Sequence, residues 1–293
     1  MRPRLGIGLL LIAILTMVVG CRPPAQLQGK PNATNYRKVI SLSPSTTEIA
    51  GTFMTDSARL QGRTSACDHP DFVRDIEVVG SVKPDFEKIA AMKPDFIVYD
   101  QTLYNDADIE KLKTIAPQAD VLVLDPSTVK SYIDFLYRFA AATASETQVM
   151  DYAEKVLQAS GVGRSNPPDP KPKVITLLGG GPNTEYMATG TQSFLADVVR
   201  DGGGEPVGPD SDRFQVVNVE HLVKWNPDLI FTSDDPKTIL SDPRLKDIGA
   251  VKGKAVLQFR GDILLRAGAR VDKLINRVRQ LIGVRSDELA GRQ

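Results

Sequence analysis

The sequence has 293 residues, 42% of them hydrophobic, and its 36 Lys and Arg residues balance its 36 Asp and Glu residues. This composition is that of an ordinary globular protein and excludes a disordered chain, which would have fewer apolar residues and a large net charge. The presence of only two cysteines excludes a disulfide scaffold, and the zero net charge argues against a dedicated nucleic-acid binder.

Residues 1–20 have the pattern of a secretory signal peptide. Two arginines, Arg2 and Arg4, precede an apolar run from Leu5 to Val19. This run of fifteen residues is short of the ~20 that a membrane-spanning helix needs, so an uncleaved membrane anchor is the weaker interpretation. The sequence therefore predicts an exported protein.

Residues 18–21, Val-Val-Gly-Cys, resemble the lipid-attachment box of bacterial lipoproteins. In such proteins the cysteine thiol receives a diacylglycerol and the chain is cut just before it; the alternative is a chance cysteine. The resemblance implies lipidation of Cys21 and a membrane anchor facing the periplasm or the cell exterior. Residues 21–36 are polar and contain prolines, which is typical of a tether, and Cys67 would be left unpaired.

The rest of the sequence contains a diverged internal repeat. A short β-branched run at residues 38–42, KVISL, returns as KVITL at residues 173–177, 135 positions later, and both runs predict buried strands. A second pair, residues 87–98 and 220–231, recurs after 133 positions. Each copy of it predicts a short helix, a Pro-Asp turn and a buried strand. Two matches at near-equal offsets predict two similar α/β lobes.

The repeat sets the predicted organisation of the chain. We expect two Rossmann-like lobes with mainly parallel sheets, residues 37–126 and 172–262, because strands alternate with helices. Asp85 and Asn218 are the expected N-caps of the repeated helices. Turn-prone stretches follow the first strand of each lobe: Ser43-Pro44-Ser45 and Gly179-Gly180-Gly181-Pro182.

Helices are expected between the lobes and at the C-terminus. In the connector, residues 127–171, the pair Ser127-Thr128 can cap one helix, and Ser145 with Gln148 suits a capping box for another. The apolar positions predicted to face the core from these two helices are Val129, Ile133, Leu136, Phe139, Val149, Tyr152, Ala153 and Val156. Residues 263–293 form the expected C-terminal helix and tail.

The motifs of common enzymes are absent. The sequence contains no Gly-x-Ser-x-Gly, His-Glu-x-x-His or Cys-x-x-Cys, and residues 249–254 miss the P-loop spacing by one. Cys67, Asp68 and His69 are consecutive, which is a poor arrangement for ligands of one metal ion. We therefore expect no catalytic residue, no metal and no cofactor. The rival interpretation, an enzyme on this scaffold, would depend on Cys67 as its nucleophile.

From Val39 to about Gly283 the chain resembles the periplasmic-binding family for cobalamin and ferric siderophores. The matching stretches are residues 39–49, 80–100, 214–230, 242–245 and 250–256. Members of this family are the substrate-binding components of ABC importers, in which a long helix bridges two lobes and the ligand binds between them. The resemblance implies a monomer whose partners are a small-molecule ligand, an ABC permease and its ATPase, and not a nucleic acid.

The resemblance also implies two residues for docking to the permease. Members of the family place one exposed Glu at the tip of each lobe, where it pairs with arginines of the permease. The matching positions are Glu87 and Glu220, which the internal repeat identifies independently. A Glu in the first turn of a helix also complements the helix dipole, by ~0.3–1 kcal/mol, and both roles can hold together.

The ligand is expected beyond the carboxyl ends of the parallel strands. Similarity to the cobalamin-binding branch implies contacts from the loop at residues 62–70, from Phe214 against the corrin plane and from the segment Arg260–Arg266. The residues expected to bind the ligand are Ser43, Pro44, Asp68, His69, Asp100, Met187, Phe214, Arg260, Asp262 and Arg266.

Three positions depart from the cobalamin-binding pattern, because the aromatic residues expected near Ala66, Ser81 and Asp100 are absent. Flat apolar macrocycles favour aromatic walls, so a different corrinoid or a ferric siderophore remains an alternative ligand. Arg260 and Arg266 would suit an anionic siderophore complex. Haem is a further alternative, whereas a free-metal carrier is disfavoured because the chain has two His residues.

Overall fold

The computed structural model describes residues 36–160, 168–181 and 184–291, all within one compact unit. The predicted signal peptide, the predicted lipidation site Cys21 and all but the last residue of the predicted tether lie outside the described residues. Among the described helices, none is both long enough and apolar enough to cross a membrane.

The first lobe is built on a five-stranded sheet in the order β3-β2-β1-β4-β5, with every neighbouring pair parallel. Its strands are β1 (Val39–Ser41), β2 (Leu60–Arg63), β3 (Glu77–Val78), β4 (Phe96–Asp100) and β5 (Asp120–Leu124). Its helices are α1 (Pro44–Phe53), α2 (Phe86–Met92) and α3 (Asp106–Ile115), with short 3-10 helices η2 (Ser57–Arg59), η3 (Asp71–Asp75) and η4 (Gln101–Leu103).

The second lobe is built on a mixed sheet in the order β11-β10-β6-β7-β9, with β8 also paired to β6. Its strands are β6 (Lys173–Gly181), β7 (Thr184–Ala188), β8 (Glu205–Pro206), β9 (Gln215–Val217), β10 (Leu229–Thr232) and β11 (Val256–Gln258). β7 is antiparallel to both of its neighbours, β6 and β9, and the other neighbouring pairs are parallel. The helices are α6 (Phe194–Asp201), α7 (Val219–Trp225), α8 (Pro236–Leu240), α9 (Gly249–Lys252), α10 (Gly261–Leu264) and the 3-10 helix η5 (Pro243–Leu245).

The stretch expected to be turn-prone, residues 179–182, differs in part, because its three glycines lie in strand β6, and Pro182 lies outside the described residues. β6 continues through Gly181, which lies opposite Thr184 on β7. At Gly180, where φ is 87°, a Cβ atom would lie 1.9 Å from the ring of Tyr186. Glycine is therefore needed here to admit that ring, a reason that the sequence alone does not reveal.

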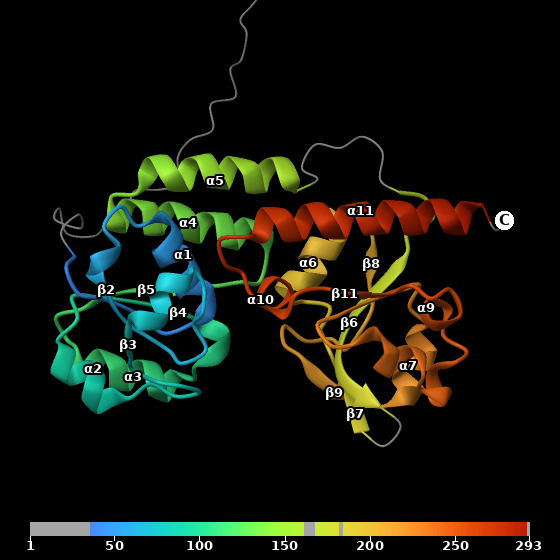
Figure 1. Ribbon diagram of the computed structural model, residues 1–293, viewed down its shortest axis with the longest axis horizontal. Helices are drawn as coiled ribbons and strands as arrows, with labels where there is room; N and C mark the ends of the chain where they lie inside the picture. Colours follow the sequence, from blue (N-terminus) through green and yellow to red (C-terminus); the bar gives the residue numbers. More distant parts are fainter. Residues whose placement is uncertain (1–35, 161–167, 182–183, 292–293) are drawn as a thin grey trace, which may run out of the picture. The chain divides into compact units, whose positions relative to one another are not determined.

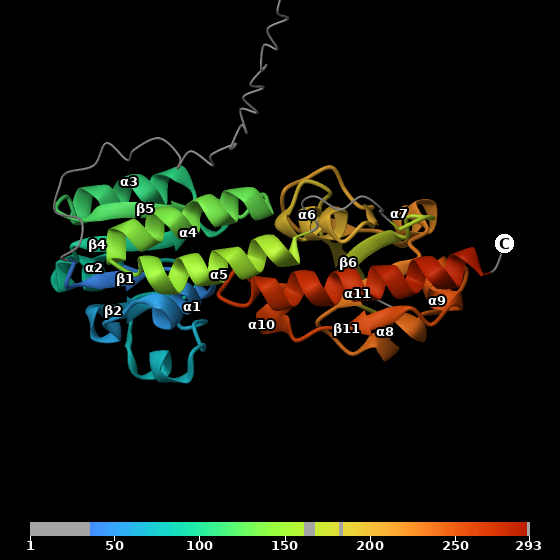
Figure 2. The ribbon, with the colours of Figure 1, turned by 90° about the horizontal axis from the view of Figure 1, so that it is seen from above.

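Two helices connect the lobes, α4 (Val129–Thr143) and α5 (Glu146–Ala159), and they lie side by side beside the C-terminal helix α11 (Val271–Ala290) (Figures 1 and 2). The left-handed residue Ala144 (φ 54°) ends α4 and turns the chain back, so the single long helix implied by the resemblance is divided in two. All eight positions predicted to face the core from these helices are buried.

The predicted caps are mostly confirmed. The side chains of Thr128, Asp85 and Asn218 each accept a hydrogen bond from a backbone N–H in the first turn of α4, α2 and α7, respectively. The capping box predicted at Ser145 and Gln148 is wrong. Ser145 makes no capping bond, because its hydroxyl lies 2.7 Å from that of Thr143 instead.

Alternate residues of the central strands face different cores. On β4, Phe96 and Val98 point into one core and Ile97 into another. On β10, Leu229 points into the same core as Phe96, whereas Ile230 points into a third. The core of Phe96 is shared by both lobes with α4, α5, α6 and α11, and each lobe covers the other face of its sheet with its own helices (Figure 1). The predicted fold class, two α/β lobes with mainly parallel sheets, is confirmed.

Candidate ligand-binding cleft

Two adjoining cavities lie where the carboxyl end of β4 faces the second lobe. One, the apolar cavity, has a volume of about 440 Å³, and the other, the polar cavity, about 830 Å³. Thr102 and Leu103 of the first lobe and Asp212 and Arg213 of the second line both of them. The two cavities therefore form one continuous cleft between the lobes, at the sheet edge where parallel α/β folds commonly bind ligands.

The walls of the apolar cavity are mostly hydrophobic. Leu103, Met187 and Leu265 are large hydrophobic residues, yet they are 51%, 42% and 44% exposed. Met187 on β7 lies opposite Val216 on β9, which is 59% exposed and on the same face of the sheet. The other hydrophobic residues of the wall include Leu178, Phe194, Leu195, Phe214 and Leu264. Exposed apolar side chains that converge on a cavity are characteristic of a ligand site.

One buried carboxylate lines the apolar cavity. Asp100, at the carboxyl end of β4, is 5% exposed, and its Oδ1 accepts hydrogen bonds from Thr102 N at 3.0 Å and Thr102 Oγ1 at 2.7 Å. Burial raises the pKa of Asp100, and the hydrogen bonds from Thr102 and Ser45 only partly oppose this effect. The wall of the apolar cavity therefore contains a carboxyl group where the cobalamin-binding pattern would place an aromatic ring.

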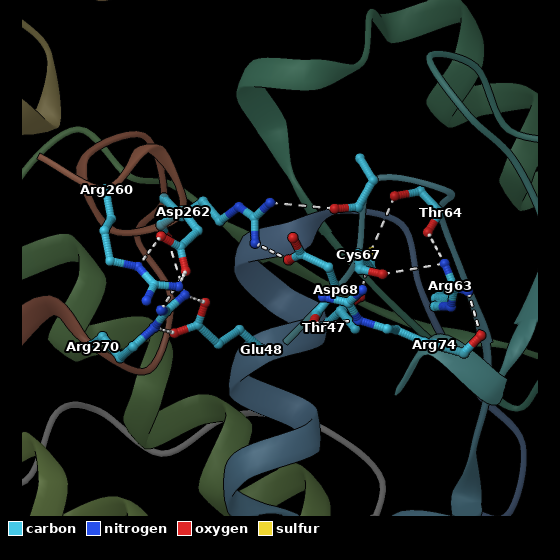
Figure 3. Close-up of polar contacts among 12 residues, drawn as sticks. Thr47, Glu48, Arg63, Thr64, Cys67, Asp68, Arg74, Arg260, Asp262 and Arg270 are labelled. Carbon is cyan, nitrogen blue, oxygen red and sulfur yellow. Dashed lines mark hydrogen bonds and ion pairs between the residues drawn. The ribbon is translucent and has the colours of Figure 1, made fainter. Parts of the chain in front are cut away.

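Arg266 also lines the apolar cavity, but it already has a partner in the other lobe. Its Nη1 lies 2.5 Å from Asp68 Oδ1, and its Nη2 donates to the carbonyl of Ala66 at 3.3 Å (Figure 3). The hydrogen bond from Arg266 lowers the pKa of Asp68. Asp68, expected to contact the ligand, is thus part of an ion pair between the lobes and lines neither cavity.

Asp262 and Arg260 belong to a separate ionic network beside the cleft (Figure 3). Asp262 accepts hydrogen bonds from Arg260 at 3.0 Å and from Arg270 at 2.6 Å, and these bonds lower its pKa strongly. Arg270 also makes two hydrogen bonds, of 2.7 and 2.8 Å, to the buried carboxylate of Glu48 on α1. Arg270, at the start of α11, therefore bonds both Asp262 of the second lobe and Glu48 of the first. Neither Asp262 nor Arg260 lines the two cavities.

Ser43, Pro44 and His69 lie outside both cavities as well. Ser43 is fully buried, and its Oγ accepts a hydrogen bond from Thr46 N at 3.1 Å, which caps α1. Pro44 is the first residue of that helix, and His69 is half-buried. Four of the ten residues expected to bind the ligand line the cleft: Asp100, Met187, Phe214 and Arg266.

Cys67 is buried, which disfavours the rival interpretation of a reactive thiol. It is 2% exposed, and its Sγ lies 3.0 Å from Thr47 Oγ1 and 3.1 Å from Thr64 Oγ1 (Figure 3). Its carbonyl oxygen accepts a hydrogen bond from the guanidinium of Arg63, which also donates to the carbonyl of Thr64. The thiol is therefore enclosed, whereas reactive cysteines are usually at least partly exposed. Among the described residues, no three His, Cys, Asp or Glu side chains are grouped as the ligands of a metal ion would be.

Glu87 and Glu220 occupy equivalent exposed positions in the two lobes. Each is the second residue of a seven-residue helix, α2 or α7, whose C-cap is left-handed, at Lys93 and Asn226. Both helices cover the face of their sheet that is turned away from α4, α5 and α11 (Figure 1). The two carboxylates are therefore presented on the same side of the compact unit.

Most residues of the cleft were not predicted from the sequence, and Leu103 and Arg213 are two of them. Leu103 follows the carboxyl end of β4 in η4, and its place next to Asp100 could have suggested it. Arg213 directly precedes Phe214 and lines both cavities. Its place directly before Phe214, which the resemblance had identified, could have suggested it in the same way.

Comparisons with known proteins agree with this architecture. The family model described as periplasmic binding protein matches residues 39–262. An uncharacterized ABC transporter substrate-binding lipoprotein of Bacillus subtilis (strain 168), YvrC, is 24% identical over 92% of this chain and 94% of its own.

Solved structures of low sequence identity share the fold. The vitamin B12 binding protein BtuF of Vibrio cholerae has a TM-score of 0.74 at 19% identity, over 85% of this chain and 98% of its own. The heme-binding protein BhuT, in complex with two hemes, has a TM-score of 0.72 at 18% identity, over 85% and 98% of the two chains. Proteins with different ligands are thus about equally similar, so the fold alone does not identify the ligand.

Proposed function

Because the chain belongs to the periplasmic binding protein family, as a substrate-binding protein of ABC transporters, we propose that it captures a corrinoid between its lobes and delivers it to a permease. The observation that carries the proposal is the apolar cavity, whose exposed Leu103, Met187 and Leu265 come from both sides of the cleft. A flat macrocycle would cover these side chains and remove their apolar surface from water.

The side chains of the cleft favour a corrinoid over haem. Haem carriers hold the iron through a protein side chain such as His, Tyr, Cys or Met, whereas a corrinoid can bring its own axial ligands. Of the two tyrosines that line the polar cavity, Tyr99 is 5% exposed and the hydroxyl of Tyr104 donates to the carbonyl of Leu42 at 2.5 Å. Among the described residues that line the two cavities, Met187 is the only one with a sulfur atom that could bind iron.

A ferric siderophore is the second candidate, and Arg213 is the observation that favours it. This arginine is exposed in the cleft, and arginine binds carboxylate-rich anions well. The acidic residues Asp106, Asp108 and Asp212 of the polar cavity act against a ligand with several negative charges. We therefore rank the siderophore below the corrinoid.

The experiment uses the soluble protein from Arg22 onward, titrated with cyanocobalamin, dicyanocobinamide, haem and ferric siderophores. Thermal stability and the visible spectrum are read together. A ligand at ~100 times its dissociation constant stabilises the folded state by about 2.7 kcal/mol, which shifts the melting temperature measurably. We expect a shift with a corrinoid that is weakened in Phe214→Ala. A shift in melting temperature with haem alone, or with a siderophore alone, would identify that compound as the ligand in place of a corrinoid. No shift with any of the compounds would contradict the proposal.

A further inference from the structure

Arg213 stands at the junction of the two cavities, on a fixed backbone. Its carbonyl oxygen accepts a hydrogen bond from Gly190 N at 3.1 Å, and its own N–H donates to Ser211 Oγ at the same distance. A Cβ at Gly190 would lie 2.0 Å from the carbonyl oxygen of Ser211, so the two segments pack at backbone contact. The position from which the Arg213 side chain extends is therefore well defined.

The guanidinium of Arg213 is only weakly engaged within the protein. Its ion pair is with the adjacent Asp212, at 3.7 Å, and both side chains are 60% exposed. Arg266, the other arginine of the cleft, differs, because its side chain is 17% exposed and paired with Asp68. Of these two arginines, Arg213 is thus the one whose side chain can reorient towards a ligand without breaking a buried ion pair.

The two cavities that meet at Arg213 have different chemistry. The apolar cavity is walled by residues such as Met187 and Phe214, whereas Gln101, Asn105 and Asp106 line the polar one. A ligand that fills both needs an apolar body and a polar appendage. The charged residues that line the polar cavity are three aspartates, Asp106, Asp108 and Asp212, and two cations, Lys83 and Arg213. This balance favours an appendage with few negative charges, and Arg213 lies where the two parts would join.

We infer that this cleft selects corrinoids that carry their nucleotide loop, and that Arg213 binds the phosphodiester of that loop. The inference rests on the proposed function and extends it to a subclass of ligand. The macrocycle occupies the apolar cavity, and the loop with its base occupies the polar cavity. A single phosphodiester anion suits one uncommitted arginine, since charge-assisted hydrogen bonds from a guanidinium to phosphate are strong.

The test compares cyanocobalamin, which has the nucleotide loop, with dicyanocobinamide, which lacks it. Dissociation constants are measured for the unmodified protein and for Arg213→Gln, Arg213→Lys and Arg277→Gln. Arg277 is the matched control, an exposed arginine on α11 that bonds Gln280 away from the cleft. We expect Arg213→Gln to weaken cyanocobalamin roughly tenfold, Arg213→Lys to weaken it less, and both to leave dicyanocobinamide unchanged.

The outcomes separate this inference from the proposed function. Equal binding of the two corrinoids, unaffected by Arg213→Gln, would overturn the inference and leave the corrinoid carrier intact. An equal loss of affinity for both ligands in Arg213→Gln would also overturn the inference, because the effect of Arg213 would then not depend on the phosphodiester. Binding of neither corrinoid by the unmodified protein would instead contradict the proposed function. Melting temperatures of the unliganded variants verify that each one folds.

Discussion

Glu48 is the most buried carboxylate in the ionic network between the lobes. It is 1% exposed on α1 and bonds the guanidinium of Arg270 through both oxygens (Figure 3). At Gly268, a Cβ would lie 2.7 Å from the Glu48 carboxyl carbon, so the chain before α11 passes directly over this group. The sequence did not predict the network, because Glu48 and Arg270 are 222 positions apart.

Replacing Glu48 tests how much this network stabilises the protein. Glu48→Gln leaves the charge of Arg270 partly uncompensated, with Asp262 as its remaining partner. We expect the free energy of unfolding, measured with urea, to fall by about 3 kcal/mol. The matched control is Glu110→Gln, which removes an exposed pair with Lys113 and should change stability by less than about 0.5 kcal/mol. Similar values for the two variants would contradict the prediction.

Asp100 gives a prediction with a defined pH dependence. Because burial raises the pKa of Asp100 in the folded state, its ionisation disfavours folding fully at a pH above that raised pKa. The penalty decreases as the pH falls below the raised pKa and is gone below the ordinary pKa that the carboxyl has in the unfolded chain. Asp100→Asn removes the charge and retains an acceptor for the hydrogen bonds from Thr102. The ligand-free variant should therefore melt at a higher temperature than the unmodified protein at neutral pH.

The melting temperatures of the two proteins should converge as the pH is lowered below the raised pKa of Asp100. The control is Asp71→Asn on the exposed 3-10 helix η3, a surface substitution that should change the stability little. A difference between Asp100→Asn and the unmodified protein that grows on acidification would be inconsistent with a raised pKa.

At the scale of elements, α2 and α7 form a pair related by the internal repeat. Their caps, lengths and left-handed C-terminal residues match, and Met92 and Trp225 pack at equivalent positions between helix and strand. The exposed Glu87 and Glu220 are therefore held in the same local frame in both lobes. This symmetry supports the proposal that they dock the protein onto the permease.

The double variant Glu87→Gln with Glu220→Gln tests this docking role. Both carboxylates are exposed and lie away from the cleft, so ligand affinity should stay within about twofold while transport into cells is lost. The control double variant is Glu110→Gln with Glu154→Gln, two exposed glutamates on α3 and α5, which should transport normally. Loss of ligand affinity in the first variant, or normal transport by it, would contradict the assignment.

The sequence predicted the helices, strands and helix caps better than it predicted the contacts between distant side chains. The repeat, the strands and three of the four proposed caps were recognisable because they depend on local patterns such as Asp85 or Asn218 before a short helix. The hairpin at Gly180 was missed, since its glycine is required by the distant ring of Tyr186. In the cleft, Met187 and Phe214 were found through the family resemblance, whereas the adjacent Arg213 was not among the residues that the resemblance implied.

At the scale of the whole compact unit, the segment after β11 links the two lobes. Arg266 pairs with Asp68 of the first lobe, and Arg270 pairs with Glu48. The hydroxyl of Tyr132 on α4 donates to the carbonyl of Gly268 at 2.6 Å. The link through Glu48 is buried, whereas Asp68 is 43% exposed at the edge of the cleft. We therefore expect the buried Arg270–Glu48 link to stay closed and the more exposed Arg266–Asp68 link to open more readily.

Asp68→Asn should loosen this outer link without unfolding the protein. Because the pair is partly exposed, the free energy of unfolding should fall by less than about 1 kcal/mol. The measurement is the distance distribution between spin labels at Lys113→Cys on α3 and Lys224→Cys on α7, two exposed sites in different lobes. The native Cys67 is buried and should label poorly.

We expect the ligand-free Asp68→Asn protein to show a broader distribution than its parent, since one of the ionic links between the lobes is gone. Bound ligand should narrow both distributions to the same width, because contacts from both walls of the cleft then hold the lobes together. Asp71→Asn, a nearby exposed substitution, serves as the control. An unchanged distribution in Asp68→Asn would mean that the buried link through Glu48 and Arg270 alone fixes the lobes.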